Sequence, residues 1–335
     1  MTKAFVFGKF LPFHKGHEAM INFALTKCDF LTVLVCCSDK ESIADTVRKA
    51  WIEKTFEQQQ NLDVRVFNYL ESELPNTSVS SQQVSKVWAD IFIQQFPDYS
   101  LLITSEPYGD FVAAFMNIQH IAFDMPRKLF PVSATAVRND VFTNWAFLPD
   151  SVKPYFAIKV ALLGTESVGK TTLAEKLSKH FNCGLVLEAG RDIIADSNAF
   201  AFDDLYLVAT AHAKRIEQTV LANSPLVIMD TDIHITKSYA QFIFNKTLEI
   251  STEIYASNHA NLYLYLNNDV EYVQDGTRLS EKERNLLDLS HRQVLAAHNI
   301  DSIEIKGDWN QRFDKAVERI NKLIATNGQN FSTLP

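Results

Sequence analysis

Hydrophobic and polar positions in the first half of the chain form short apolar runs separated by longer stretches with helical spacing. β-branched and aromatic residues dominate these runs, as is typical of strands buried in a parallel sheet. The runs comprise residues 4–7, 30–37, 63–67, 101–104 and 120–123. Their alternation with helix-compatible stretches predicts a β/α domain.

A second series of strand-like runs follows, at residues 156–163, 184–187, 226–229, 262–266 and 302–305. Between the two series, Pro149 and Pro154 interrupt the pattern and disfavour a continuous helix. We therefore expect two doubly wound parallel-sheet α/β domains, residues 1–150 and 151–327, with a boundary near Asp150. The last residues, from Thr326 on, are expected to form a loose tail.

Composition narrows the class of protein. The 335 residues exceed one ordinary domain, and 47% hydrophobic with 21% charged residues is globular usage. With 32 Lys and Arg against 40 Asp and Glu, the net charge of −8 disfavours capture of a nucleic acid or an anionic membrane. No apolar run approaches the ~20 residues of a membrane span, and no secretory signal is visible. We expect a cytoplasmic protein with neither kind of partner.

The cysteines bear on metal chemistry. Cys28, Cys36, Cys37 and Cys183 show no C-x-x-C spacing, and most lie in or beside apolar runs. This pattern suits reduced thiols in a core better than disulfides or a metal site. We therefore expect no structural metal.

The sharpest motif is a phosphate-binding loop in the second series. Residues 164–171 read GTESVGKT and match G-x-x-x-x-G-K-[ST], with an apolar strand before them and a helical stretch after. Glycines let successive backbone N–H groups surround phosphate oxygens at a helix N-terminus. Lys170 is expected to reach the β and γ phosphates, and Thr171 to place its hydroxyl on Mg²⁺. The expected ATP-binding residues here are Gly164, Ser167, Val168, Gly169, Lys170, Thr171 and Thr172.

Acidic residues follow two predicted strands of the same domain. Asp230 ends the run at 226–229, where it would hold Mg²⁺ or accept the proton of an attacking hydroxyl. Asp232 comes two residues later, and Glu188 follows the run at 184–187 with Arg191 close behind. A helix cap or a solvent-facing acid is the alternative for each one taken singly.

Two arginines downstream, Arg278 and Arg284, lie in a polar stretch with charges of both signs. Such a stretch suggests a mobile segment that brings guanidinium groups over the phosphates of ATP. A plain solvated loop is an equally good interpretation.

In the first domain, Gly8, Lys9 and Phe10 lead directly from the first strand to His14 and His17. Histidines three apart in a first helical turn face the same side, where a phosphate would meet two imidazoles and the helix N-terminus. Zinc is a competing interpretation, but no cluster of Cys or acidic residues accompanies the pair.

A second element of this domain, Ser133, Thr135 and Arg138, offers hydroxyls at an expected helix start and an arginine one turn onward. Hydroxyls and a guanidinium in this arrangement also suit a phosphate.

These motifs carry a family resemblance. His14-Lys-Gly-His17 resembles the (H/T)xGH signature of nucleotidyltransferases, and Ser133-x-Thr135-x-x-Arg138 resembles their ISxTxxR signature. Followed by a P-loop kinase domain, they resemble the bifunctional nicotinamide-nucleotide adenylyltransferase and ribosylnicotinamide kinase of the NadR type, over nearly the whole chain. The sequence departs from that pattern in having no helix-turn-helix module before the first strand, and in Lys9, where an arginine is common.

The resemblance implies two reactions and a set of residues. ATP would phosphorylate nicotinamide riboside in the second domain, and nicotinamide mononucleotide (NMN) would attack a second ATP in the first, giving NAD and pyrophosphate. Mg²⁺ is the implied cofactor, with no tightly bound organic group, and a homo-oligomer is left open. The remaining implied substrate contacts are Trp88 (or a plain core tryptophan), Ser105, Tyr108, Glu188, Arg191, Asp230 and Asp232.

Two alternatives keep the nucleotidyltransferase and change the second domain. That domain is either a kinase for another nucleoside, because a P-loop reports phosphate and not the acceptor, or an ATP-gated regulatory module. The acids after its strands favour a kinase, since a pure sensor has less need of them.

Overall fold

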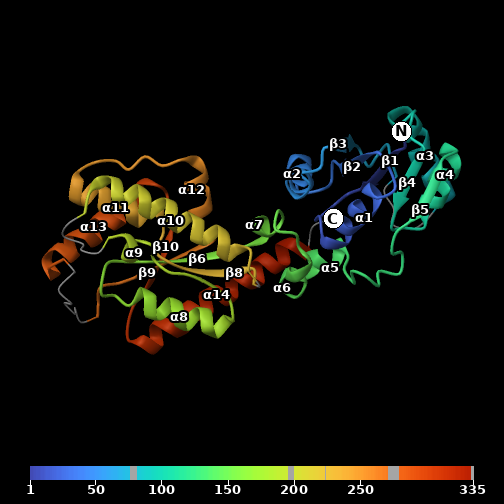
Figure 1. Ribbon diagram of the computed structural model, residues 1–335. Helices are drawn as coiled ribbons and strands as arrows, with labels where there is room; N and C mark the ends of the chain where they lie inside the picture. The colour runs from blue at the N-terminus through green and yellow to red at the C-terminus, as the bar shows by residue number, and fades with distance from the viewer. Residues whose placement is uncertain (76–80, 195–199, 223, 271–278, 333–335) are drawn as a thin grey trace. The chain divides into compact units, whose positions relative to one another are not determined.

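Figure 1 shows the protein in a computed structural model, which describes residues 1–75, 81–194, 200–222, 224–270 and 279–332. The chain forms two compact units: the first is built from Met1–Lys153 together with the end of the chain from Gly328, and the second from Pro154–Asn327. Each contains one five-stranded sheet in which every pairing is parallel.

The sheet of the first unit has the order β3-β2-β1-β4-β5. From β1 the chain adds β2 and β3 on one side, then returns and adds β4 and β5 on the other side of β1. Because the crossovers between parallel strands are right-handed, α1 and α2 lie on one face of the sheet and α3 and α4 on the opposite face. The elements are β1 (Lys3–Gly8), α1 (Lys15–Leu25), β2 (Phe30–Ser38), α2 (Asp45–Thr55), β3 (Leu62–Tyr69), α3 (Gln82–Gln95), β4 (Leu101–Thr104), α4 (Tyr108–Met116), β5 (Gln119–Ala122), α5 (Ala134–Asn139), α6 (Val141–Asn144) and the 3₁₀ helix η1 (Trp145–Phe147).

The second unit has the strand order β10-β9-β6-β8-β7. In Figure 1, α8 and α14 lie on one side of this sheet, with α10, α11 and α13 on the other. The elements are α7 (Lys153–Phe156), β6 (Ile158–Leu163), α8 (Lys170–Phe181), β7 (Gly184–Val186), α9 (Gly190–Ile193), α10 (Phe202–Val220), β8 (Leu226–Asp230), α11 (Ile233–Phe244), α12 (Thr252–Asn258), β9 (Leu262–Leu266), α13 (Glu281–Ala297), β10 (Ser302–Ile305) and α14 (Trp309–Ser332).

The two cores explain why these elements form. In the first unit, Phe5 stacks on Phe96 with ring centroids 4.4 Å apart and meets Phe92 edge to face at 5.5 Å. In the second, Val160 and Leu162 of β6 pack with Leu173 of α8 in one buried cluster. Strands buried on both faces must be apolar at every position, which is why the runs in the sequence are continuous.

The predicted fold class is confirmed, and each of the ten predicted runs overlaps an observed strand. The prediction of a loose tail from Thr326 is wrong for the described residues, because α14 continues to Ser332. Extending a formed helix by a few residues costs far less than nucleating one, which explains why the helix continues beyond Thr326. None of the described helices is long and apolar enough to span a membrane.

Candidate functional site

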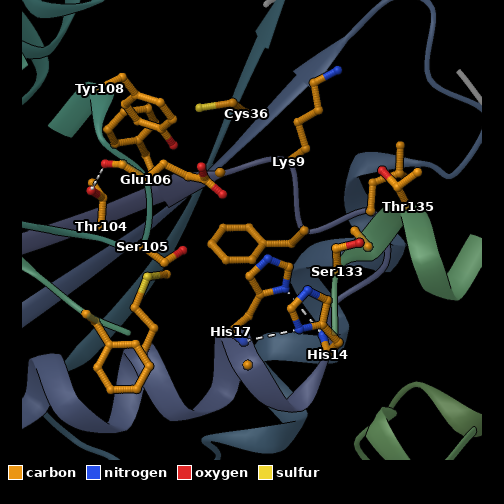
Figure 2. A pocket seen from close by; sticks show the side chains of 18 of the residues that line it. Lys9, His14, His17, Cys36, Thr104, Ser105, Glu106, Tyr108, Ser133 and Thr135 are labelled. Carbon is orange, nitrogen blue, oxygen red and sulfur yellow. Dashed lines mark hydrogen bonds between the residues drawn. The ribbon is translucent and has the colours of Figure 1, made fainter. Parts of the chain in front are cut away.

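A cavity of about 650 Å³ opens in the first unit at the carboxyl ends of β1 and β4, where the direction of strand succession reverses. Ligands of open parallel sheets bind at such switch points. Figure 2 shows the cavity with its labelled side chains. All the site residues predicted for this domain line it: Gly8, Lys9, Phe10, His14, His17, Trp88, Ser105, Tyr108, Ser133, Thr135 and Arg138.

His14 and His17 are fixed by the start of α1. His14 is the N-cap, and the two rings stack with centroids 3.6 Å apart. The backbone N–H of His17 donates to Nδ1 of His14 at 3.4 Å, and that of His14 donates to Nδ1 of His17 at 3.3 Å (Figure 2). Because both Nδ1 atoms accept, each neutral ring carries its proton on Nε2.

The electrostatics keep both rings neutral near pH 7. Burial, followed by the nearby charge of Arg127, lowers the pKa of His14 to about 3. Burial also holds the pKa of His17 well below its usual range, with His14 and Arg127 adding to the effect. The pair therefore offers two oriented neutral N–H donors, which suit phosphate oxygens. Among the described residues, no group of three or more His, Cys, Asp or Glu side chains is arranged to hold a metal.

Lys9 is held by a buried network that sequence reasoning missed. Its Nζ lies 3.0 Å from Oε1 of Glu41, whose side chain is only 1% exposed. Arg48 of α2 is also buried and donates through one nitrogen to Oε2 of Glu41 at 2.7 Å and to the backbone carbonyl of Lys9 at 3.0 Å. Both ends of Lys9 are thus tied to the second βα unit of the sheet.

The second predicted element caps a short helix, as expected from its sequence. Ser133 is the N-cap of α5 and accepts from the backbone N–H of Ala136 at 3.0 Å. One nitrogen of Arg138 donates to the carbonyl of Leu11 at 2.5 Å, and the other approaches Thr135 Oγ1 at 3.4 Å. The arginine therefore connects α5 to the loop that carries the histidines.

The opposite end of the cavity is aromatic. Trp88 of α3 meets Tyr69 edge to face with centroids 5.2 Å apart, and its Nε1–H donates to the carbonyl of Pro75 at 3.2 Å. The ring packs against the core and also lines the cavity, so the core and ligand-facing interpretations both hold for it. Tyr108 lies nearby, and burial raises the pKa of its hydroxyl, so it remains protonated.

The loop after β4 is positioned by a compact hydrogen-bond cluster. Thr104 Oγ1 donates to the carbonyl of Glu106 at 2.9 Å and lies 3.0 Å from Nε2 of His120. Nδ1 of His120 lies 2.7 Å from Oδ1 of Asp110. Gly109 leaves the space for this cluster, since a Cβ there would come within 2.3 Å of Thr104 Oγ1 and 2.4 Å of His120 Nε2.

Gly109→Ala is accordingly expected to lower the free energy of unfolding of the first unit by about 1–3 kcal/mol, the usual cost of overpacking. Urea denaturation followed by tryptophan fluorescence reports mainly this unit, which holds Trp51, Trp88 and Trp145. Gly8→Ala is the matched control, because its added Cβ would meet only ordinary contacts at 3.6 Å or more. Equal midpoints for the two variants would contradict the assignment.

In the second unit, the phosphate-binding loop lies between β6 and α8 as predicted. Gly169 caps α8 with φ +84°, and a Cβ there would collide with the Trp309 ring. Gly164 adopts φ +136°, which only glycine tolerates well, and Ser167 adopts φ +59°. Val168 is buried beneath the loop, whereas Thr172 is exposed in the first turn of α8.

Lys170, Thr171 and Asp230 meet at this loop. Nζ of Lys170 donates to the carbonyls of Gly164 and Thr165, each at 2.8 Å. Thr171 Oγ1 donates to Oδ2 of Asp230 at 2.5 Å, and Oδ1 of Asp230 is buried with no hydrogen-bond partner among the residues that the structure describes. A hydroxyl beside a carboxylate with an unused oxygen is the donor set that Mg²⁺ takes at a nucleotide phosphate, so these two residues fit the ion.

The other predicted acids differ in their surroundings. Burial raises the pKa of Glu188, with Lys170 acting to lower it and Asp230 to raise it, so Glu188 belongs to the same electrostatic cluster. Arg191 Nε lies 3.5 Å from Oε2 of Glu188. Asp232 is the N-cap of α11: its Oδ1 accepts from the backbone N–H groups of His234 and Ile235, and its Oδ2 lies 2.5 Å from Nδ1 of the His234 ring. This geometry fits a helix cap better than a ligand contact.

Arg284 does not belong to a mobile loop, so that prediction is wrong for this residue. It lies in the first turn of α13 with only 3% of its surface exposed. A capping box starts the helix here, with Ser280 and Glu283 bonded to each other's backbone N–H. The S-x-x-E pattern of this capping box is present in the sequence and indicates a helix start at Ser280. Arg278 lies outside the described residues.

Sequence reasoning also missed Arg312, which supports the phosphate-binding loop. This fully buried arginine donates to the carbonyls of Val168 at 3.0 Å and Gly307 at 2.8 Å, and pairs with Asp269. Glu166, within the loop, accepts from the hydroxyl of Tyr239 at 3.1 Å. No local pattern marks either residue.

Comparisons with known proteins agree with this division. Residues 4–99 match the family described as citrate lyase ligase C-terminal domain, and residues 159–312 match the family described as AAA domain. Two curated relatives share nearly the whole chain, both named trifunctional NAD biosynthesis/regulator protein NadR. The protein of Escherichia coli K12 is 28% identical and that of Salmonella typhimurium 27%, each alignment covering 96% of this chain and 83% of the relative.

Solved structures show the same two-unit fold. A crystal structure of NadR protein in complex with NR has a TM-score of 0.68 at 20% identity, and one in complex with NAD and AMP-PNP has 0.65 at 18%. Each similarity covers 96% of both chains. The family resemblance drawn from the two signatures and the P-loop is therefore confirmed.

Proposed function

We propose that this chain, a homologue of the NadR proteins over nearly its whole length, makes NAD in two ATP-dependent steps. In the first step, the 5′-hydroxyl of nicotinamide riboside attacks the γ-phosphate of ATP in the domain assigned to residues 151–327, giving NMN and ADP. In the second, the phosphate of NMN attacks the α-phosphate of another ATP in the domain assigned to residues 1–150, giving NAD and pyrophosphate. The observation that carries the proposal is the coexistence of the stacked histidine pair and the P-loop in a homologue of proteins named for NAD biosynthesis.

The adenylyl transfer needs no protein nucleophile, because the attacking phosphate is already an anion. Catalysis then consists of positioning the substrates and stabilising charge that develops on the triphosphate. The Nε2–H groups of His14 and His17, the ammonium of Lys9 and the guanidinium of Arg138 are the donors we assign to this task. Ser133 and Thr135 add hydroxyls beside His14 (Figure 2).

The phosphoryl transfer relies on the loop from Gly164 to Thr172. Lys170 exchanges its backbone carbonyl partners for ATP phosphates, and Thr171 with Asp230 holds Mg²⁺, which when bound neutralises charge on the β and γ phosphates. Glu188 is the acid we place beside the attacking hydroxyl, because it follows the end of β7 next to Arg191 and a carboxylate there can accept the hydroxyl proton. We assign Arg191 as a substrate contact. The ATP contact of Arg278 stays a sequence prediction, and Arg284, which is buried in α13, is not assigned one.

The function is tested directly by mixing the protein with Mg²⁺-ATP and nicotinamide riboside and following ADP, NMN and NAD by chromatography. ADP with neither NMN nor NAD would refute the acceptor assignment. NMN without NAD would refute the adenylyltransferase. Uridine or thymidine in place of the riboside separates this kinase from one for another nucleoside.

Asp230→Asn should reduce the kinase rate by roughly a hundredfold or more, since the amide keeps the shape but loses the charge that holds Mg²⁺. NAD formation from supplied NMN, measured in the same preparation, should stay normal, and an unchanged thermal unfolding midpoint for the second unit would show that this unit is folded in the variant. Asp203→Asn, at an exposed position in the first turn of α10, is the matched control. A kinase rate within about threefold of wild type, equivalent to ~0.65 kcal/mol, would remove Asp230 from the site.

A further inference from the structure

Arg127 lies outside every motif that the sequence displays, yet it lines the cavity of the first unit. Among the described residues, the cationic lysine and arginine side chains of that lining are Lys9, Arg127 and Arg138. Lys9 is paired with buried Glu41, and Arg138 is bonded to the carbonyl of Leu11. Arg127 is paired differently, with Nη2 2.7 Å from Oε1 of Glu106 and both side chains about half exposed.

The backbone holds Arg127 at this place. Asp124 accepts from the backbone N–H groups of Lys128 and Leu129 through its carboxylate, both at 2.9 Å, and from that of Arg127 through its carbonyl at 2.8 Å. Asp124 and Arg127 both adopt left-handed conformations, with φ +39° and +50°. Non-glycine residues in this region are strained, and such strain concentrates at functional positions. The hydrogen bonds of this turn therefore fix the backbone of Arg127 beside the cavity.

The charge of Arg127 reaches the centre of the site. It is among the causes that lower the pKa of His14 and of His17, so the guanidinium lies close enough to act on both rings. A group with that reach also acts on a phosphate held by the same histidines. Phosphate is the better partner for a guanidinium fork, because it carries more charge than one carboxylate and accepts two parallel N–H bonds.

Glu106 is well placed to compete for the guanidinium. Its carbonyl is fixed by Thr104 Oγ1, and Figure 2 shows its carboxylate on the cavity side of the loop after β4. Exposed ion pairs contribute little net stability, so exchanging this carboxylate for a phosphate loses little.

We propose that Arg127 binds a phosphate group of the substrates in the first unit, and that Glu106 is an exchangeable counterion that competes with that phosphate. The inference rests on the proposed adenylyltransferase. It adds Arg127 to Lys9 and Arg138 as a third cationic side chain that binds substrate phosphates. The phosphate belongs either to NMN or to the triphosphate of ATP.

The two partners should respond in opposite directions. Arg127→Ala is expected to raise the KM for one of the two substrates by tenfold to a hundredfold, and Arg127→Lys by less, because a point charge replaces the fork. Glu106→Gln is expected to lower that same KM by a few fold, since it removes the competing anion. If the ion pair had only a structural role, removing either partner would impair the enzyme. Impairment by both Arg127→Ala and Glu106→Gln would therefore overturn the proposal.

The initial rate of NAD formation is measured with NMN varied at saturating ATP and the reverse. A raised KM for NMN places Arg127 on the phosphate of NMN, and a raised KM for ATP places it on the triphosphate. Lys128→Ala is the matched control, because Lys128 is exposed, adjacent in sequence and absent from the cavity lining. Unchanged KM values for both substrates in Arg127→Ala would also overturn the proposal.

A second measurement is independent of the chemical step. Calorimetric titration with inorganic pyrophosphate, in a Lys170→Ala background that weakens the P-loop, should show weaker binding with Arg127→Ala and unchanged binding with Lys128→Ala. If wild-type protein makes no NAD from NMN, the proposed function fails, and this titration still decides the inference. Equal affinities in the Arg127→Ala and Lys128→Ala variants would refute the phosphate contact.

Discussion

Replacing His17 by alanine is expected to lower the rate of NAD formation from NMN by ~10² to 10³, while NMN formation from the riboside stays near normal. The ring stacks on His14 at 3.6 Å, and its Nδ1 is already engaged by a backbone N–H, which leaves Nε2–H as its contribution to the cavity. Removal takes away one oriented donor to charge that develops on the triphosphate. The two rates are measured in the same preparation, each from its own substrate.

His17→Gln separates the loss of the donor from damage to the helix start. A glutamine keeps an N–H donor and is favoured at the third helical position of a capping box, so it should lose less activity than alanine. Equal urea midpoints for the two variants would assign the difference to chemistry. An adenylyltransferase unimpaired in His17→Ala would remove the first signature from the site.

The fold could be predicted because both sheets are parallel and buried. The central strands are apolar on both faces, so they stand out from the amphipathic helices around them, and even the four-residue β4 is visible in the sequence. The loop residues predicted to bind phosphate were equally visible, because glycines with positive φ and an N-cap hydroxyl are local requirements. Gly164, Gly169 and Ser133 are of this kind.

The rest of the site depends on contacts between distant segments. Arg312 reaches Val168 across 144 residues, and Arg48 reaches Lys9 across 39. The sequence around a charged residue on a helix predicts that its side chain is solvated. Only the order of the strands reveals that the side chain points at a loop. The pairing of Arg127 with Glu106 was also missed, since 21 positions along the chain, with helix α4 and strand β5 between them, separate the two residues.

Lys170→Ala is expected to abolish NMN formation and to leave NAD formation from supplied NMN unchanged. Nζ of Lys170 has its partners, the carbonyls of Gly164 and Thr165, within its own unit, and the alanine removes the charge that would contact ATP phosphates there. The kinase rate should fall by at least ~10², as when an electrostatic stabiliser of a transition state is lost. Lys176→Ala, an exposed lysine of the same helix, is the matched control and should alter neither rate.

NAD formation by the Lys170→Ala variant decides whether the two sites are independent or the P-loop controls the adenylyltransferase. His14, His17 and Arg138 belong to the first compact unit, whereas Lys170 and Asp230 belong to the second, so neither set takes a residue from the other. Full NAD formation by the Lys170→Ala variant then means that each unit completes its own reaction. A loss greater than about tenfold in a folded variant, ~1.4 kcal/mol of coupling, would instead mean that ATP at the P-loop controls the adenylyltransferase, because a mutation confined to one site would have changed the other.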